Sequence, residues 1–358
     1  MPAQELQRRQ REAPSTAPST PQQQETGSLN APRDSGFLRD IRSRIAQRSS
    51  QDESKGAANF TREELTTHAV NVVNQWAEQL TAMDPKSPEH RQLLNKIHLV
   101  SRTLIAADVY SDDARRNGSL PSHIDRLDAN GVSIMLGAHF DASLLKGKFN
   151  GYSAALYYDR ISKTIILANR GTSDPADWAN NFKQAVGATA PQYRQAVDLA
   201  GSVKTALKEQ YGMNASLEFV GHSLGGGIAS LQAVVFPDCP AITFNAAGLH
   251  RNTVEDELCR LGRGASEITT KNISALRLAG DILSEIQEDM EKIFQGAIAP
   301  EAVGVPRVIN PAQQALSGRP GVALAQGLER HMMHKVLFEV LRKEGVEPLD
   351  QDQKGTHR

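Results

Sequence analysis

From about residue 59 onwards, apolar residues recur along the chain with the periods of helices and strands. Thr61 and Glu64 have the spacing of a capping box, and a helical period follows through Ala69, Val72, Val73, Trp76 and Leu80. A second helix is expected over about residues 90–109. Residues 110–148 carry several turn residues and no assignable period, so we expect a connector there.

Beyond residue 151, short apolar runs alternate with helical stretches. Runs at 153–158 and 164–168 are separated by five residues, four of them polar or charged, and predict a hairpin. Further buried strands are expected at 217–220, 241–244 and 273–278, with helices at about 177–185, 192–210, 252–261 and 322–342. This alternation predicts a mostly parallel α/β sheet flanked by helices, with an antiparallel edge.

Residues 1–56 are rich in Gln, Ser, Thr, Pro and Arg and poor in apolar side chains, which predicts a disordered leader. Within it, Phe37, Leu38, Ile41 and Ile45 recur at helical spacing among arginines. They indicate either a basic amphipathic helix that contacts an anionic membrane or a partner, or a transient helix in a tail. After the leader we expect a helical segment at 57–110 packed on a catalytic domain at 111–346, and a polar tail at 347–358.

Composition excludes several classes of protein. The 358-residue chain has a formal net charge of −1 and no basic stripe, so no nucleic-acid partner is expected. Its two cysteines, Cys239 and Cys259, are typical of reduced residues rather than a disulfide framework. No run approaches the roughly 18 apolar residues of a membrane span. No charged start precedes an apolar stretch either, so an ordinary secretory signal peptide is not expected.

The clearest chemical motif is Gly-x-Ser-x-Gly, over Gly221 to Gly225, between a predicted strand and a helix. This is the pattern of a nucleophile elbow, in which a strained serine, here Ser223, presents its hydroxyl to a cleft on an α/β-hydrolase sheet. Side chains at Gly221 and Gly225 would collide with neighbouring backbone. The alternative is an ordinary serine in a Gly-rich turn.

A serine nucleophile needs a base and an orienting acid, which follow it in the order acid, then His. Asp281 comes just after a predicted strand, whereas its competitors Asp238 and Asp256 end no strand. The alternative role for Asp281 is a helix N-cap.

For the base we prefer His331, where a loop enters the last helix, and keep His334 as the reserve. The two are expected on one helix face, but no carboxylate or thiol cluster accompanies them, so we expect no metal and no cofactor. His222 is expected to pack away from the cleft. The oxyanion hole would use the N–H of Leu224 and a donor from Thr172, in the loop Arg170-Gly171-Thr172.

These motifs together resemble the class 3 (fungal-type) lipase family, including its bacterial branch of phospholipase-like secreted effectors. The resemblance covers about residues 109–341 and rests on Arg170-Gly171-Thr172, the elbow at Ser223 and the stretch 243–249. It implies that Thr172 supplies an oxyanion donor and Ser223 the nucleophile. It also matches Asp281 to the family's acid, and a His-x-Met-x-x-Val pattern favours His331 as the base. Asn169 departs from the apolar residue common before Arg-Gly-Thr, which would alter the acyl pocket.

We therefore expect a serine lipase or phospholipase of A type that hydrolyses carboxylic esters of lipids through an acyl-enzyme. Its substrate would be a lipid or phospholipid, with peripheral membrane contact. Segments around Trp178 and at 297–320 are candidates for a lid and an acyl-binding wall.

The alternative to an enzyme is a catalytically inactive hydrolase-fold effector that binds a host protein or membrane. The leader resembles type III export signals and predicts a host protein or chaperone partner. It also predicts that the chain is secreted into a host cell without an ordinary signal peptide. If the chain is not secreted, we expect it in the cytoplasm.

Overall fold

A computed structural model of the chain describes residues 61–111, 118–147, 150–171, 190–212, 215–281, 283–284, 302–311 and 330–346. The chain divides into two units, residues 1–44 and 45–358, and every described residue belongs to the second unit. The predicted leader at 1–56, the tail at 347–358 and the helix at 177–185 lie outside the described residues. The prediction of the domain boundaries therefore stays a prediction.

The described strands form one sheet, in which they lie side by side in their order along the chain. They are β1 (Ile124–Arg126), β2 (Ala154–Asp159), β3 (Thr164–Asn169), β4 (Ser216–His222), β5 (Ala241–Phe244), β6 (Ile273–Leu278) and β7 (Val305–Ile309). Strands β1, β2 and β3 are paired antiparallel, and every pair from β3 to β7 is parallel. The mostly parallel sheet with an antiparallel edge, and the hairpin within it, are confirmed.

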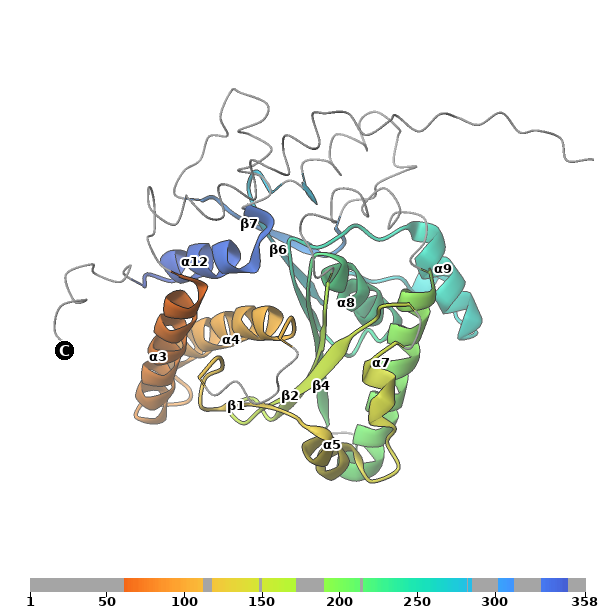
Figure 1. The fold of residues 1–358 in the computed structure, drawn as a ribbon, viewed down its shortest axis with the longest axis horizontal. Coiled ribbons are helices and arrows are strands. Elements are labelled where there is room, and N and C mark those ends of the chain that lie inside the picture. The colour runs from red at the N-terminus through yellow and green to blue at the C-terminus, as the bar shows by residue number, and fades with distance from the viewer. Residues whose placement is uncertain are drawn as a thin grey trace, which may run out of the picture. The chain divides into compact units, whose positions relative to one another are not determined.

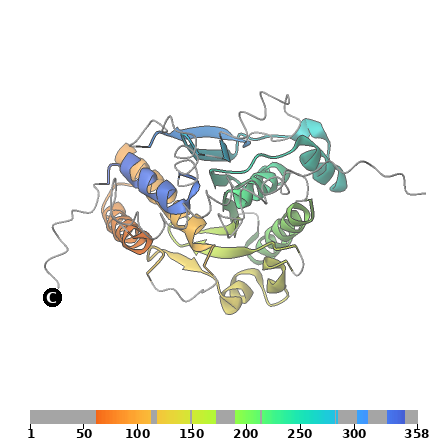
Figure 2. The same ribbon diagram turned by 45° about the horizontal axis from the view of Figure 1, so that its top comes forward.

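Helices cover both faces of this sheet (Figures 1 and 2). One face carries α3 (Arg62–Thr81), α4 (Pro88–Asp108) and α12 (Met333–Lys343). The other carries α5 (Ala129–Leu136), α7 (Ala190–Tyr211), α8 (Leu224–Val235) and α9 (Arg251–Arg260), with short 3₁₀ turns η2 (Ala142–Leu145) and η4 (Ala265–Glu267). Neighbouring side chains of a strand point to opposite faces, so Phe219 packs with α7 and α8 while Val220 packs with α4.

Three elements differ from the sequence prediction. Helix α4 begins at Pro88, capped by Ser87, because proline is well accommodated in a first helical turn whose N–H groups lack partners anyway. The supposed connector at 110–148 contains β1 and α5. The segment at 297–320, proposed as a lid or wall, contains β7, which pairs with β6 at the sheet edge; residues 305–309 are therefore part of the sheet. The capping box of Thr61 and Glu64 is confirmed.

A buried ionic cluster joins α4 to the sheet. Arg102 of α4 is fully buried and contacts Asp159 at the end of β2 (2.5 Å) and Glu218 of β4 (2.7 Å). His98 also contacts Glu218, at 3.2 Å. Burial by itself raises the pKa of both carboxyl groups, but the Arg102 charge and the hydrogen bonds outweigh it, so both pKa values lie below their ordinary values.

Replacing Arg102 with methionine should reduce the free energy of unfolding at pH 7 by about 3–5 kcal/mol, since two buried carboxylates lose their partner. Because the pKa values of Asp159 and Glu218 are lowered in the folded state, the two carboxylates stabilise the fold fully when the pH is above their ordinary pKa values of 3.8 and 4.5. This stabilisation is lost as the pH falls through their folded-state pKa values. The difference between wild type and variant should therefore shrink on acidification. Urea unfolding at pH 7 and near pH 3 measures both effects.

The exposed pair of Arg160 and Asp125 (2.7 Å) provides a matched control for this prediction. Arg160→Met should cost about 1 kcal/mol or less, because solvent screens an exposed ion pair. Equal losses in the two variants would contradict a special role of the buried cluster.

Candidate active site

Ser223 occupies a strained corner between β4 and α8. Its backbone has φ 56° and ψ −128°, a conformation that non-glycine residues rarely adopt. The corner is held from both sides, because Ser223 N–H donates to the Phe244 carbonyl (3.1 Å) and the Ser223 carbonyl accepts from Gly226 (2.9 Å) and Ala247 (2.9 Å). The predicted strand–turn–helix elbow is present, and with the mostly parallel sheet it gives the α/β-hydrolase fold expected from the sequence.

The glycines of this corner are required by packing. A Cβ atom at Gly221 would collide with the backbone of Gly225. A Cβ atom at Gly225 would collide with the carbonyl of Asn169, at the end of β3. Both collisions involve backbone atoms, which cannot move aside without distorting the sheet, so the glycine requirement inferred from the sequence is confirmed.

Asp281 and His331 meet at the carboxyl edge of the sheet. His331 Nδ1 hydrogen-bonds Asp281 Oδ1 at 2.7 Å, and both side chains are buried. The second carboxylate oxygen of Asp281 accepts from the backbone N–H and the hydroxyl of Ser284, each at 2.9 Å. One oxygen of Asp281 therefore caps the following turn, while the other holds the imidazole of His331.

Three hydrogen bonds anchor the backbone around His331. Asn245, which follows β5 with a positive φ of 41°, donates from its amide to the Arg330 carbonyl (2.9 Å). Arg330 donates to the Ala279 carbonyl after β6 (2.9 Å), and His222 at the end of β4 donates to the His331 carbonyl (2.6 Å). The ends of three neighbouring strands thus fix the position of His331, whose ring centroid lies 4.8 Å from that of His222.

His331 and His334 do not share a helix face, contrary to the sequence expectation. Met332 between them has an extended backbone (φ −69°, ψ 138°) and caps the N-terminus of α12. His331 therefore precedes this helix and turns toward Asp281, whereas half-buried His334 lies within it. Asp238, a competitor for the acid, is instead paired with Lys204 at 2.5 Å near the surface.

The two predicted oxyanion donors differ in how far the structure describes them. Leu224 is the first residue of α8, where N–H groups have no partner within the helix. Thr172 and Trp178 lie outside the described residues, but Gly171 is described. A Cβ atom at Gly171 would lie 3.3 Å from Ser223 Cβ and 2.6 Å from the His222 carbonyl oxygen. The loop after β3 therefore begins in direct contact with the elbow.

Asn169, expected to alter an acyl pocket, has its side chain within the core. Its Oδ1 accepts from the Tyr152 hydroxyl (2.8 Å), and its Nδ2 donates to Gln232 of α8 (2.7 Å). These bonds satisfy a buried amide and tie the end of β3 to the helix behind the elbow.

Ser223 Oγ is buried, and among the described residues it has no hydrogen-bond partner. The contact between this hydroxyl and a base is therefore not closed in this structure.

The described residues contain no group of three His, Cys, Asp or Glu side chains that could hold a metal ion. Within the same ranges, no helix has both the length and the apolar character needed to cross a membrane.

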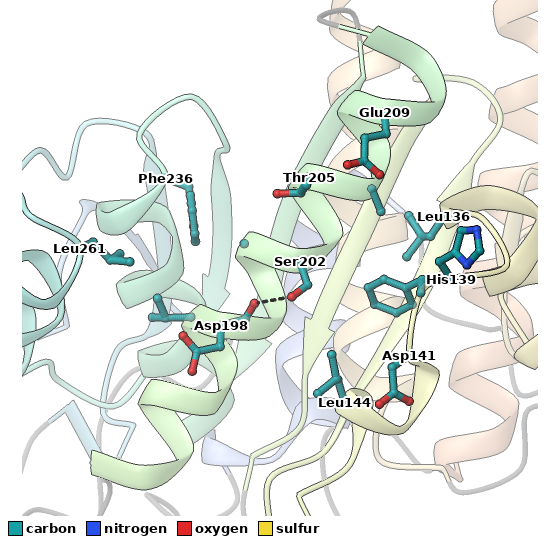
Figure 3. A pocket seen from close by; sticks show the side chains of 14 residues that line it. Leu136, His139, Asp141, Leu144, Asp198, Ser202, Thr205, Glu209, Phe236 and Leu261 are labelled. Carbon is teal, nitrogen blue, oxygen red and sulfur yellow. Dashed lines mark hydrogen bonds between the residues drawn. The ribbon is translucent and has the colours of Figure 1, made fainter.

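A groove with a volume of about 650 Å³ runs along the outer side of α7, between α5 with η2 and the end of α8 (Figure 3). Its floor carries Ser202, whose hydroxyl donates to the Asp198 carbonyl (3.0 Å), and its walls include Phe140 and Phe236. Phe236 follows the C-terminus of α8, roughly 20 Å along the helix from Ser223 at 1.5 Å per residue. None of the predicted site residues lines this groove.

Comparison with known proteins finds a relative and several similar solved structures. The chain is 32% identical over 242 residues to the extracellular phospholipase A1 of Serratia liquefaciens, covering 65% of this chain and 67% of the relative. Among solved structures, it resembles the Lip2 lipase of Yarrowia lipolytica (TM-score 0.36, 15% identity, 59% of this chain and 77% of the lipase). It also resembles the Rhizomucor miehei lipase propeptide complex (TM-score 0.41, 13% identity, 66% and 79%).

A family model matches residues 101–331, which include the elbow, Asp281 and His331. This range covers more than half of the chain. The chain belongs to the phospholipase-like family defined by the Tle-like phospholipase domain.

Proposed function

We propose that this chain hydrolyses the carboxylic esters of lipids through Ser223, His331 and Asp281. As a member of its family, the chain is an ester hydrolase of the lipase and phospholipase type. The observation that carries the finer proposal is the 2.7 Å hydrogen bond between Asp281 and His331, beside a strained serine at a nucleophile elbow. This is the geometry in which an acid orients a base toward a serine.

In the proposed reaction, His331 Nε2 accepts the proton of Ser223 Oγ as the oxygen attacks the ester carbonyl. Catalytic hydrogen bonds often close when substrate binds, and the Ser223–His331 contact would close at this step. Asp281 accepts a hydrogen bond from the Nδ1–H group of His331 and stabilises the imidazolium. The N–H of Leu224 and a donor from Thr172 would stabilise the tetrahedral oxyanion.

Collapse of the tetrahedral intermediate completes the first half of the reaction. The alcohol, a lysophospholipid when the substrate is a phospholipid, leaves with the proton from His331, and the acyl group stays on Ser223. Water then attacks this acyl-enzyme while His331 takes its proton. As the second tetrahedral intermediate releases the fatty acid, His331 returns the proton to Ser223 Oγ.

We propose glycerophospholipid as the substrate class, because the curated relative is named a phospholipase A1. The relative is also named extracellular, which supports our proposal that this chain is secreted. We further propose that the secreted chain acts as an effector inside a host cell. Peripheral contact with a membrane would follow from a bilayer substrate.

The test uses phospholipid vesicles whose sn-1 and sn-2 positions carry different acyl chains, with triolein emulsion and a short-chain nitrophenyl ester in parallel. We expect release of the sn-1 fatty acid together with lysophospholipid. A fluorophosphonate probe should add the mass of one probe group to the peptide that contains Ser223. Fatty-acid release should fall in proportion to the fraction of the chain that is labelled.

Hydrolysis of triolein without hydrolysis of phospholipid would replace the substrate class but keep the serine mechanism. A folded chain that neither reacts with the probe nor hydrolyses any of the three esters would contradict the enzyme proposal. That result would favour an inactive scaffold that acts by binding.

A further inference from the structure

Tyr110, just beyond the end of α4, reaches the elbow through its hydroxyl. The hydroxyl lies 2.9 Å from His222 Nδ1, and the tyrosine and histidine ring centroids are 5.9 Å apart. Gly171, in the loop after β3, lies against the same hydroxyl. A Cβ atom at Gly171 would collide with this hydroxyl, so the glycine makes room for it.

The hydrogen bonds of His222 determine which of its ring nitrogens carries the hydrogen. His222 Nε2 lies 2.6 Å from the carbonyl oxygen of His331, and a carbonyl can only accept, so Nε2 carries the hydrogen. In a neutral imidazole Nδ1 is then an acceptor, and it receives the Tyr110 hydroxyl hydrogen. The hydrogen bonds therefore run in one direction, from Tyr110 through His222 to the backbone of His331.

The protonation states of these two groups keep this direction over a wide pH range. Burial, with a smaller contribution from the neighbouring His331, holds the pKa of His222 well below its ordinary value, so its ring stays neutral beside His331. Burial also raises the pKa of Tyr110, so its hydroxyl keeps its hydrogen. A neutral His222 does not repel the positive charge that His331 would gain during the reaction.

We propose that Tyr110 is a positioning residue for the reaction, because its hydroxyl lies against the loop of Gly171 and hydrogen-bonds His222, and His222 holds the backbone that carries His331. This inference rests on the proposed serine mechanism and goes beyond it. It gives the helical segment before the sheet a part in catalysis, although Tyr110 itself touches neither substrate nor the reacting atoms.

The test is Tyr110→Phe, which keeps the ring and removes the hydroxyl. We expect kcat for a soluble nitrophenyl ester to fall about 10- to 100-fold, as for small displacements of catalytic groups, while KM stays unchanged. The matched control is Tyr157→Phe. Tyr157 is fully buried, and its hydroxyl donates to Asp108 (2.8 Å) rather than to the elbow. The control should lower the melting temperature at least as much and leave kcat intact.

A double-mutant cycle tests whether Tyr110 acts through His222. His222→Leu should lower kcat at least as far as Tyr110→Phe, and the double variant should be no slower than His222→Leu alone. If His222→Leu fails to fold, the comparison of Tyr110→Phe with Tyr157→Phe decides the question. Wild-type kcat in Tyr110→Phe, an equal fall of kcat in Tyr157→Phe, or fully additive losses in the cycle would overturn the proposal.

Ser223→Ala in the same assay separates this proposal from the one on which it rests. Full hydrolysis by Ser223→Ala would overturn the serine mechanism and the positioning role with it. An inactive Ser223→Ala beside a fully active Tyr110→Phe would overturn the positioning role alone.

Discussion

Replacing Ser223 with alanine should lower kcat for ester hydrolysis by about 10⁴- to 10⁶-fold, since the nucleophile is lost while the oxyanion donors remain. The fold should be kept, because the bonds that hold the elbow are made by the Ser223 backbone. Alanine tolerates the positive φ no worse than serine does. Release of fatty acid from vesicles and of nitrophenol from a soluble ester measures the loss, and circular dichroism checks the fold.

Ser230 provides a matched control on the same helix. It is fully buried in α8, and its hydroxyl donates to the Gly226 carbonyl at 2.9 Å, one turn earlier. Ser230→Ala removes an equally buried hydroxyl and should leave kcat within a few-fold of wild type, because that bond lies within the helix. Activity that persists in Ser223→Ala, or falls equally in both variants, would argue against Ser223 as the nucleophile.

The sheet could be predicted from the sequence where its strands are buried on both faces. Strands β4, β5 and β6 are short apolar runs, and the two latter were predicted with their observed bounds. Strand β7 could not be predicted, because most of its residues are exposed and it contains Pro306, so it lacks an apolar run. Strand β1 has three residues, Ile124–Arg126, too few for a period to show.

The meeting of Asp281 with His331 could be expected from chain order and from the strand that precedes Asp281. What holds His331 in place could not. Asn245 lies 86 residues before His331 in the sequence and bonds to the carbonyl of the neighbouring Arg330. Tyr110 lies farther away still and acts only through His222. Such bonds have no periodic pattern, although Asn245 lies inside one of the family-like motifs.

Helix α4 and the residues just beyond it contribute polar groups to the sheet at three places, which no apolar pattern indicates. Arg102 binds the strands β2 and β4, Asp108 accepts from Tyr157 of β2, and Tyr110 reaches the end of β4. The helix packs in the same core as α12, directly before which His331 lies. Residues of this helix and of the segment directly after it therefore contribute both to stability and to the geometry of the candidate site.

The choice between the two histidines is tested by replacing each with glutamine. His331→Gln should lower kcat by about 10⁴-fold or more, because glutamine cannot take the Ser223 proton and Asp281 would lose the imidazole that it orients. His334→Gln is the matched control, since His334 lies within α12, beyond the extended Met332, and should keep kcat within a few-fold of wild type. The measurement is kcat for a soluble ester at pH 8.

A second measurement separates loss of the base from loss of structure. His331→Gln should retain the elbow, so a fluorophosphonate probe should still reach Ser223, but the reaction should slow in step with kcat because the unassisted hydroxyl is a poor nucleophile. Melting temperatures of the two variants should lie within a few degrees of each other. The reverse pattern, with kcat lost in His334→Gln and kept in His331→Gln, would assign the base to His334. It would also require α12 to turn toward Ser223, against the packing in which Met332 caps this helix and His331 is fixed by three strand ends.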